Sequence, residues 1–265
     1  MPRDAAPEST DVLCESCGYR LNGLPPSGNC PECGQPVAAS TTESPRHLPA
    51  WEGLPGKRGR TIREVLRSPD RFFRTLSLHD DTCRSRRFAL LFLAIASLFS
   101  AKTIVYHYLV TVFLSVPPPW LPPIWVLIAI LPFLLFGCWY GLLELVIYLT
   151  AAEGKFWGLR MPRGIVRRVI HYWTPHVALA SVVMSFVPLA YLLMLASNNR
   201  AGLYMAEYLY VLSGMVVVAA IYLFKTYWVA MKAIMYGNAA PFGEAKTDWN
   251  AKAPRGQELK TEEWT

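Results

Sequence analysis

The chain has 265 residues, of which 53% are hydrophobic and only 17% are charged, and its formal net charge is +7. Such an apolar excess argues against a single soluble domain. The hydrophobic residues are concentrated between positions 88 and 235, whereas 1–87 and 236–265 are polar, which predicts a membrane-embedded core with two polar ends. We therefore expect an all-α integral membrane helical bundle with a small N-terminal module.

The first ten residues, MPRDAAPEST, contain no apolar stretch of the kind that a secretory signal requires. We therefore expect the N-terminus to stay in the cytoplasm. Because thiols are kept reduced there, the cysteines that follow should not be paired in disulfides.

Two Cys-x2-Cys pairs lie within residues 1–37, Cys14 with Cys17 and Cys30 with Cys33. Four thiolates at this spacing can close a tetrahedral site, so they predict a zinc ribbon that binds one Zn²⁺, with iron as the alternative metal. A glycine follows each pair and permits the left-handed turn that points backbone amides at the sulfurs. Four protein ligands leave no open position for water, so the site should be structural and not catalytic.

The ribbon is too poor in apolar residues to fold around a core of its own, so the metal should hold it together. Arg20 is the only basic residue between the first and last of these cysteines, and Glu15 and Glu32 lie beside it. This charge balance argues against nucleic acid as a ligand of the ribbon. We expect its partner to be a protein.

Residues 38–60 are rich in Ser, Thr, Pro and Gly without apolar periodicity, which predicts a flexible linker that tethers the ribbon loosely. Beyond it, residues 61–87 should form short juxtamembrane helices. Thr61 with Glu64 has the spacing of a capping box, and Ser68 followed by proline marks a second helix start.

The arginines of this region alternate with apolar residues, as in amphipathic helices that lie on a membrane surface with anionic head groups. The segment before the third predicted span, KFWGLRMPRGIVRRVIHYW, has the same composition. The alternative interpretation is the ordinary enrichment of basic residues beside membrane spans. In the region 61–87, the arginines that alternate with apolar residues are Arg63, Arg67, Arg71 and Arg74.

Four segments are long and apolar enough to cross a bilayer, namely 88–110, 124–147, 173–196 and 205–228. Lys and Arg are abundant before the first span and between the second and third, and absent from the hairpin 117–123. Since basic flanking residues stay on the cytoplasmic side, both termini should be cytoplasmic, including the polar tail 236–265.

Small residues at helical spacing indicate where spans pack closely. Gly137 and Gly141 form a G-x-x-x-G on the second span, and Ser181 and Ser185 form a weaker small-x-x-x-small on the third. These residues could pack inside the bundle or form the interface of a homo-oligomer. Internal packing is favoured because every four-helix bundle requires such contacts.

Lys102, His107 and Glu144 are candidates for an intramembrane polar site, because ionisable residues within a membrane are functional candidates by default. Each of them could instead extend its side chain to the membrane boundary. The chain contains no HExxH, GxSxG, P-loop or GxGxxG pattern, so we assign no catalytic residue.

The stretch CGYRLNGLPPSGNCPECGQPV resembles a recurring type of bacterial membrane protein in which a CxxCGYxLxGLxxxGxCPECG ribbon precedes several spans. This resemblance implies a location in the bacterial cytoplasmic, or inner, membrane and transfers no established activity. More weakly, SPDRFFRTL and RRVIHYWTPHVALA are similar to Yip-family membrane proteins, which implies a helical bundle that acts in membrane organisation and trafficking without catalysis.

Together these features predict a non-enzymatic membrane scaffold or adaptor that presents a cytoplasmic zinc ribbon to a protein partner, in membrane organisation or trafficking. The alternative is a small-solute transporter or an intramembrane enzyme that uses the polar residues of the spans.

Overall fold

The structure is a computed structural model that describes residues 11–41, 46–53, 58–78, 83–114, 124–159, 161–197 and 205–238. Within these ranges the chain forms helices and isolated β-bridges but no extended strand. The helices are α1 (Val37–Ser40), α2 (Ala50–Gly53), α3 (Arg58–Arg67), α4 (Pro69–Thr75), α5 (Cys83–Leu114), α6 (Ile124–Phe156), α7 (Arg163–Ser197) and α8 (Met205–Ile234).

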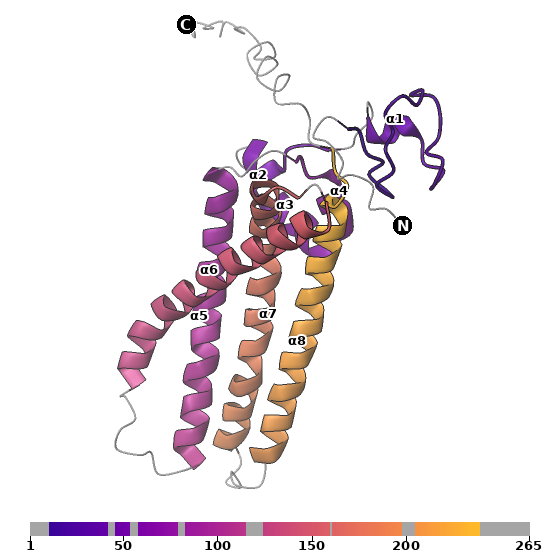
Figure 1. Cartoon of the computed structure of the whole chain (residues 1–265). Helices are drawn as coiled ribbons and strands as arrows, with labels where there is room; N and C mark the ends of the chain where they lie inside the picture. The colour runs from indigo at the N-terminus through magenta and orange to yellow at the C-terminus, as the bar shows by residue number, and fades with distance from the viewer. Residues whose placement is uncertain are drawn as a thin grey trace, which may run out of the picture.

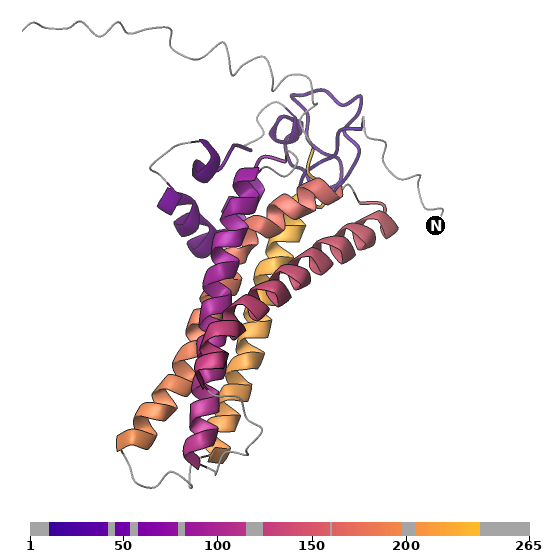
Figure 2. The same cartoon turned by 90° about the vertical axis from the view of Figure 1, so that its left-hand side faces the viewer.

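The four long helices, α5 to α8, are each long and apolar enough to cross a membrane, which confirms the predicted fold class of an all-α membrane bundle. In Figure 1, α5, α7 and α8 run lengthwise and α6 crosses them obliquely. Figure 2 shows α6 leaving the other three helices at an angle. Helix α7 packs against all three of its long neighbours and therefore forms the centre of the bundle.

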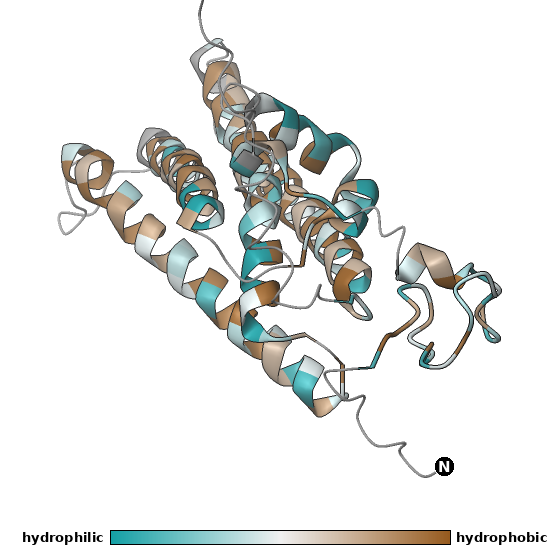
Figure 3. Ribbon diagram, turned by 90° about the horizontal axis from the view of Figure 1, so that it is seen from above, coloured by the Kyte–Doolittle hydropathy of each residue, from teal (hydrophilic) through white to brown (hydrophobic). Residues whose placement is uncertain are grey.

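The four-cysteine module and the short helices α2 to α4 lie at one end of the bundle, which we call the module end (Figure 1). The opposite end, where α5, α7 and α8 reach the bottom of that view, is the distal end. Seen from the module end, hydrophobic residues run along the long helices and hydrophilic residues gather on the short helices (Figure 3).

The amphipathic helices α3 and α4 turn their apolar side toward the bundle. Val65, Phe72 and Phe73 are buried in the main hydrophobic core, where α3 packs on α7 and α4 packs on α8. The arginines of these two helices, among them Arg63 and Arg71, remain exposed. The prediction that this apolar face lies on a membrane surface was therefore wrong, because other helices of the same chain cover it.

Of the two predicted helix starts, the one at Ser68 is confirmed and the one at Thr61 is wrong. Helix α3 begins at Arg58, so Thr61 lies in its first turn and is no N-cap; its hydroxyl accepts a hydrogen bond from the Trp51 amide at 2.9 Å. Helix α4 begins at Pro69 directly after Ser68, as predicted, although the Ser68 side chain makes no cap hydrogen bond. Thr61 is thus used to hold α2 against α3.

The described parts of the predicted linker 38–60 are packed against the bundle. The His47 amide donates to the Thr75 carbonyl at 2.7 Å and its carbonyl accepts from the Ser77 amide at 3.1 Å. Glu52, in α2, is buried. These contacts contradict a loose tether in 46–53, while 42–45 and 54–57 lie outside the described residues.

Two long helices extend further toward the module end than the predicted spans. Helix α6 continues to Phe156 and α7 begins at Arg163, so residues 163–173 of the basic segment before the third span form the first part of α7. Val166, Val169 and Ile170 are fully buried there. The apolar face of α7 that contacts neighbouring helices therefore begins before the predicted span 173–196. Residues 239–265 of the predicted tail and the hairpin 117–123 lie outside the described residues.

Candidate metal centre

The two Cys-x2-Cys pairs lie on two loops with the same backbone hydrogen bonds. In the first loop the Cys14 amide donates to the Tyr19 carbonyl at 2.8 Å, and the Gly18 amide donates to the Cys14 carbonyl at 2.8 Å. An antiparallel bridge closes each loop. In the second loop the corresponding bonds run from the Cys30 amide to Gln35 at 2.7 Å and from the Gly34 amide to Cys30 at 2.9 Å.

Each loop depends on the glycine after its second cysteine. Gly18 has φ 82° and Gly34 has φ 72°, in the left-handed region that residues with a side chain avoid. Gly18 also lies against Tyr236, since a Cβ on Gly18 would come within 2.6 Å of the Tyr236 Cε1 atom. Both turn geometry and close approach therefore require glycine at position 18.

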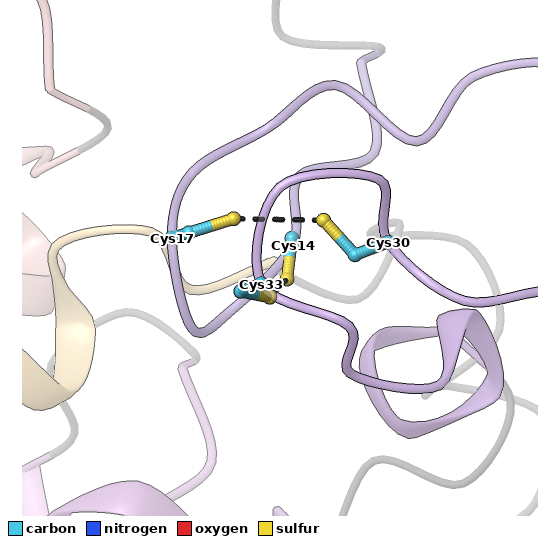
Figure 4. Close-up of side chains that lie close together, drawn as sticks. All are labelled: Cys14, Cys17, Cys30 and Cys33. Carbon is cyan, nitrogen blue, oxygen red and sulfur yellow. Dashed lines mark hydrogen bonds between the residues drawn. The ribbon is translucent and has the colours of Figure 1, made fainter.

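The four sulfur atoms converge on one point (Figure 4). All four Sγ atoms lie within 4.8 Å of one another, with 3.5 Å between Cys14 and Cys33 and 3.6 Å between Cys17 and Cys30. A tetrahedral zinc centre with Zn–S bonds of about 2.3 Å has sulfurs about 3.8 Å apart. The four thiols are therefore spaced as a tetrathiolate metal site requires.

The surroundings of the sulfurs differ across the centre. Burial raises the pKa of the Cys14 thiol and raises that of Cys17 to about 12. The Gln35 amide donates to Cys33 and lowers the pKa of its thiol to about 7, even though Cys33 is exposed. Because metals bind the thiolate, a cation at this centre would displace protons from the more buried pair.

The module is attached to the end of α8 through Asn238. The Asn238 side-chain oxygen accepts from the Leu13 amide at 2.9 Å, and its amide group donates to the Leu13 carbonyl at 2.7 Å. The same amide group donates to the Ser40 carbonyl at 3.0 Å. One side chain thus bonds both the start of the first loop and α1.

Arg46 makes a second attachment between the module and the bundle. Its Nε atom donates to the Glu15 carboxylate at 2.9 Å, with both side chains largely buried. Its terminal nitrogens donate to the carbonyls of Leu76 and Ala233, each at 3.1 Å. The guanidinium therefore connects the module, the end of α4 and the end of α8.

A buried ion pair fixes the segment between the module and α3. Glu52 in α2 lies 3.0 Å from Arg168 in α7, and their side chains are 5% and 1% exposed. The Tyr172 hydroxyl donates to the same carboxylate. The sequence analysis missed this pair because Glu52 lies in a segment with the composition of a linker. The signal that could have indicated it is the spacing of Arg168 and Tyr172, which puts both side chains on one face of α7.

Comparison of the chain with protein-family models, with curated proteins and with solved structures finds no match. The resemblances of the cysteine motif and of the segments around α4 and α7 therefore stay predictions. The function has to be inferred from the residues of the chain itself.

The three candidate polar residues of the spans each have a separate set of partners. Glu144 in α6 faces α7, where it accepts from Arg167 at 3.1 Å and from Arg163 at 3.5 Å. His107 in α5 shares a hydrogen bond of 2.7 Å with the Tyr208 hydroxyl in α8. The ammonium of Lys102 lies over three aromatic rings, at 5.4 to 5.7 Å from those of Phe99, Tyr106 and Phe186. The described contacts do not join these residues into one site.

The small residues of the spans are used in different ways. Gly137 and Gly141 are exposed, and no atom lies within 4 Å of a Cβ built on either. The expected internal packing of this motif is therefore wrong for the described part of the chain, because α6 turns the motif away from the other helices. Ser181 and Ser185 are buried, and Ser181 accepts a hydrogen bond from Ser100 at 3.3 Å.

Proposed function

We propose that the protein is an integral membrane adaptor whose four-cysteine module is a zinc ribbon, held at the cytoplasmic face and presented to a protein partner. The observation that carries the proposal is the attachment of the module. Asn238 and Arg46 fix one side of it to the bundle. The other side, which includes the second cysteine loop, is exposed.

Zinc is proposed because four thiolates favour a soft, tetrahedral ion. Iron is the alternative that the same ligands accept. With four protein ligands the ion has no position for substrate, so its role is to fold the module. Leu21 and Val37, together with the buried cysteines, form a core too small to do this alone.

The cytoplasmic location is supported by the charge of the module end. Four arginines, on α3 and α4, point away from the core there, and basic residues beside membrane spans favour the cytoplasmic side. The same surface suits a bilayer with anionic head groups. The residues concerned are Arg63, Arg67, Arg71 and Arg74.

A protein partner is supported by the chemistry of the exposed side of the module. Pro25, Pro26 and Pro31 are exposed and limit its conformational freedom, so binding costs little ordering entropy. Glu32 is the charged residue of the second loop, and nothing basic accompanies it in that loop. A rigid, weakly acidic surface does not suit nucleic acid.

A transporter or enzyme is the weaker candidate because Lys102, His107 and Glu144 have separate partners. The arginines around Glu144 and the aromatic rings around Lys102 account for these side chains without a substrate.

The test is metal analysis for zinc and iron together with affinity capture from detergent-solubilised membranes. The variant is Cys30→Ser with Cys33→Ser, and the matched control is Cys83→Ser with Cys138→Ser, two exposed cysteines outside the cluster. We expect one zinc ion per chain and the same captured proteins in wild type and control, and neither in the variant. Zinc loss with every partner retained would show that the module is only a folding element, and the adaptor proposal would be wrong.

A further inference from the structure

A cavity of about 580 Å³ lies between the distal halves of α7 and α8. Side chains between Val183 and Met194 line it on α7, and side chains between Glu207 and Met215 line it on α8. Its size is in the range of small-molecule sites, about 300 to 1,000 Å³. The lining is almost entirely apolar, as expected for a site that opens within a membrane.

The sequence explains why the helices leave this space. Val183, Val187 and Tyr191 are spaced four residues apart, so they lie on one face of α7, and the two valines have short side chains. Pro188 lies within this segment of α7 and removes a helical hydrogen bond, which favours a bend. Figure 2 shows the distal end of α7 set apart from that of α8.

The polar side chains of the lining, Tyr191, Tyr208 and Glu207, lie at the same end of the cavity. The rings of Tyr191 and Tyr208 stack with centroids 4.5 Å apart, and Tyr208 adjoins Glu207 in the chain. The Tyr208 hydroxyl bonds to His107, whereas the Tyr191 hydroxyl is buried and has no hydrogen-bond partner among the described residues. Tyr191 is only 7% exposed, so water does not compensate it. The Tyr191 side chain lines the cavity, so a small shift of its ring would bring the hydroxyl to an acceptor supplied by a ligand.

Glu207 is the only charged residue among those described in the lining, and it is exposed. A carboxylate at the mouth of an apolar cavity selects a cation that can donate hydrogen bonds. From this polar end the apolar lining continues about two helical turns toward Met215 on α8 and Val183 on α7. Polar groups at one end and apolar length beyond them match a phospholipid, whose esters adjoin its head group.

We propose that this cavity binds one bilayer phospholipid with a primary-amine head group. One acyl chain fills the space between α7 and α8, an ester carbonyl accepts from the Tyr191 hydroxyl once its ring has shifted toward the cavity, and the ammonium donates to Glu207. A quaternary ammonium has no N–H to donate, so phosphatidylcholine should bind less well than phosphatidylethanolamine. This site is separate from the adaptor function of the module.

The test is native mass spectrometry of the full-length protein, reconstituted with equimolar phosphatidylethanolamine and phosphatidylcholine. The wild type should retain one phosphatidylethanolamine molecule. Ala190→Trp, which fills the cavity, should abolish retention, whereas Val217→Trp on the exposed surface of α8 should not change it. Glu207→Gln should lower the preference for the amine head group roughly tenfold, the loss expected for one charge-assisted hydrogen bond.

Ala190→Trp could lose the lipid because the chain misfolds, so a second variant, Tyr191→Phe, removes one hydroxyl and keeps the ring. We expect it to elute like wild type and to lower retention about fivefold, as for a lost neutral hydrogen bond. Retention unchanged in both Ala190→Trp and Tyr191→Phe would overturn the site. Equal retention of the two lipids by the wild type would overturn the head-group assignment, and equal loss in Val217→Trp would show general lipid adhesion only.

Discussion

At the module end, α2 packs on α5, α3 packs on α7 and α4 packs on α8, whereas at the distal end the described chain provides no such cover. Phe73, Phe88 and Tyr172 are buried in the main core at the module end. At the distal end Phe133 and Tyr210 are about four-fifths exposed. Among the described residues of the distal end, a small cluster around Val110 and Tyr191 is packed.

The contrast teaches that the two ends are stabilised by different surroundings. Packing among side chains of the chain itself holds the module end together. The exposed apolar side chains of the distal end are expected to be solvated by lipid tails, which are as apolar as leucine and provide no hydrophobic drive for helices to associate. Substitutions should therefore be costly at the module end and mild at the distal end.

Arg168→Met should have the largest effect on the stability of the bundle. It keeps an apolar stem of similar length but leaves the Glu52 carboxylate buried without its cation, at a cost of about 3–5 kcal/mol in unfolding free energy. Denaturant unfolding in detergent measures it. Arg74→Met is the control, because its pair with Asp70 is exposed and worth about 0–1 kcal/mol. Equal losses in the two variants would contradict the buried pair.

Phe73→Ala and Phe133→Ala compare the two ends with the same substitution. Phe73 is fully buried, so its truncation should cost about 3–5 kcal/mol. Phe133 is 80% exposed, so its truncation should change the unfolding free energy by less than about 0.5 kcal/mol. The same unfolding assay applies. A large loss in Phe133→Ala would show that the distal surface is packed against protein.

Asn238→Ala should release the module without removing its metal. Three hydrogen bonds from one side chain disappear, with a buried carbonyl and amide of Leu13 left unsatisfied, at a cost of about 1–3 kcal/mol. Hydrogen exchange should increase in the module and at the end of α8, while metal content stays at one ion per chain. Loss of metal in this variant would show instead that the module cannot fold undocked.

Gly141→Leu should have the smallest effect, because a Cβ at this position meets no atom within 4 Å. Gly154→Leu is the matched control on the same helix, since a Cβ there would lie 2.9 Å from that of Met161 and should cost about 1–3 kcal/mol. Thermal unfolding and sedimentation report both variants. A destabilised Gly141→Leu chain would indicate that α6 packs against a second copy of the protein.

The cysteine cluster and the four long helices are predictable from sequence because their signals are local. The spacing of Cys14 and Cys17, with glycine next, determines a turn over a few residues. A long apolar segment that must satisfy its own backbone in a membrane can only be helical. Neither inference depends on which residues meet from distant parts of the chain.

The errors occurred where distant partners decide the outcome. The apolar face of α4 has the same periodicity whether lipid or α8 covers it, so Phe72 could not be placed from the pattern. Asn238 looks like an ordinary residue after a helix, and its role depends on Leu13, 225 positions away. The surroundings of Lys102 likewise include Phe186 from another helix.

The bond between Asn238 and Leu13 also constrains the order of assembly. The ribosome makes the module before any of the long helices, and the attachment point at the end of α8 is made after them, so this bond cannot form until the fourth long helix is in place. A chain that stalls after α7 lacks the bonds from the module to the end of α8. Docking of the module on α8 therefore marks a chain in which all four of these long helices have been made.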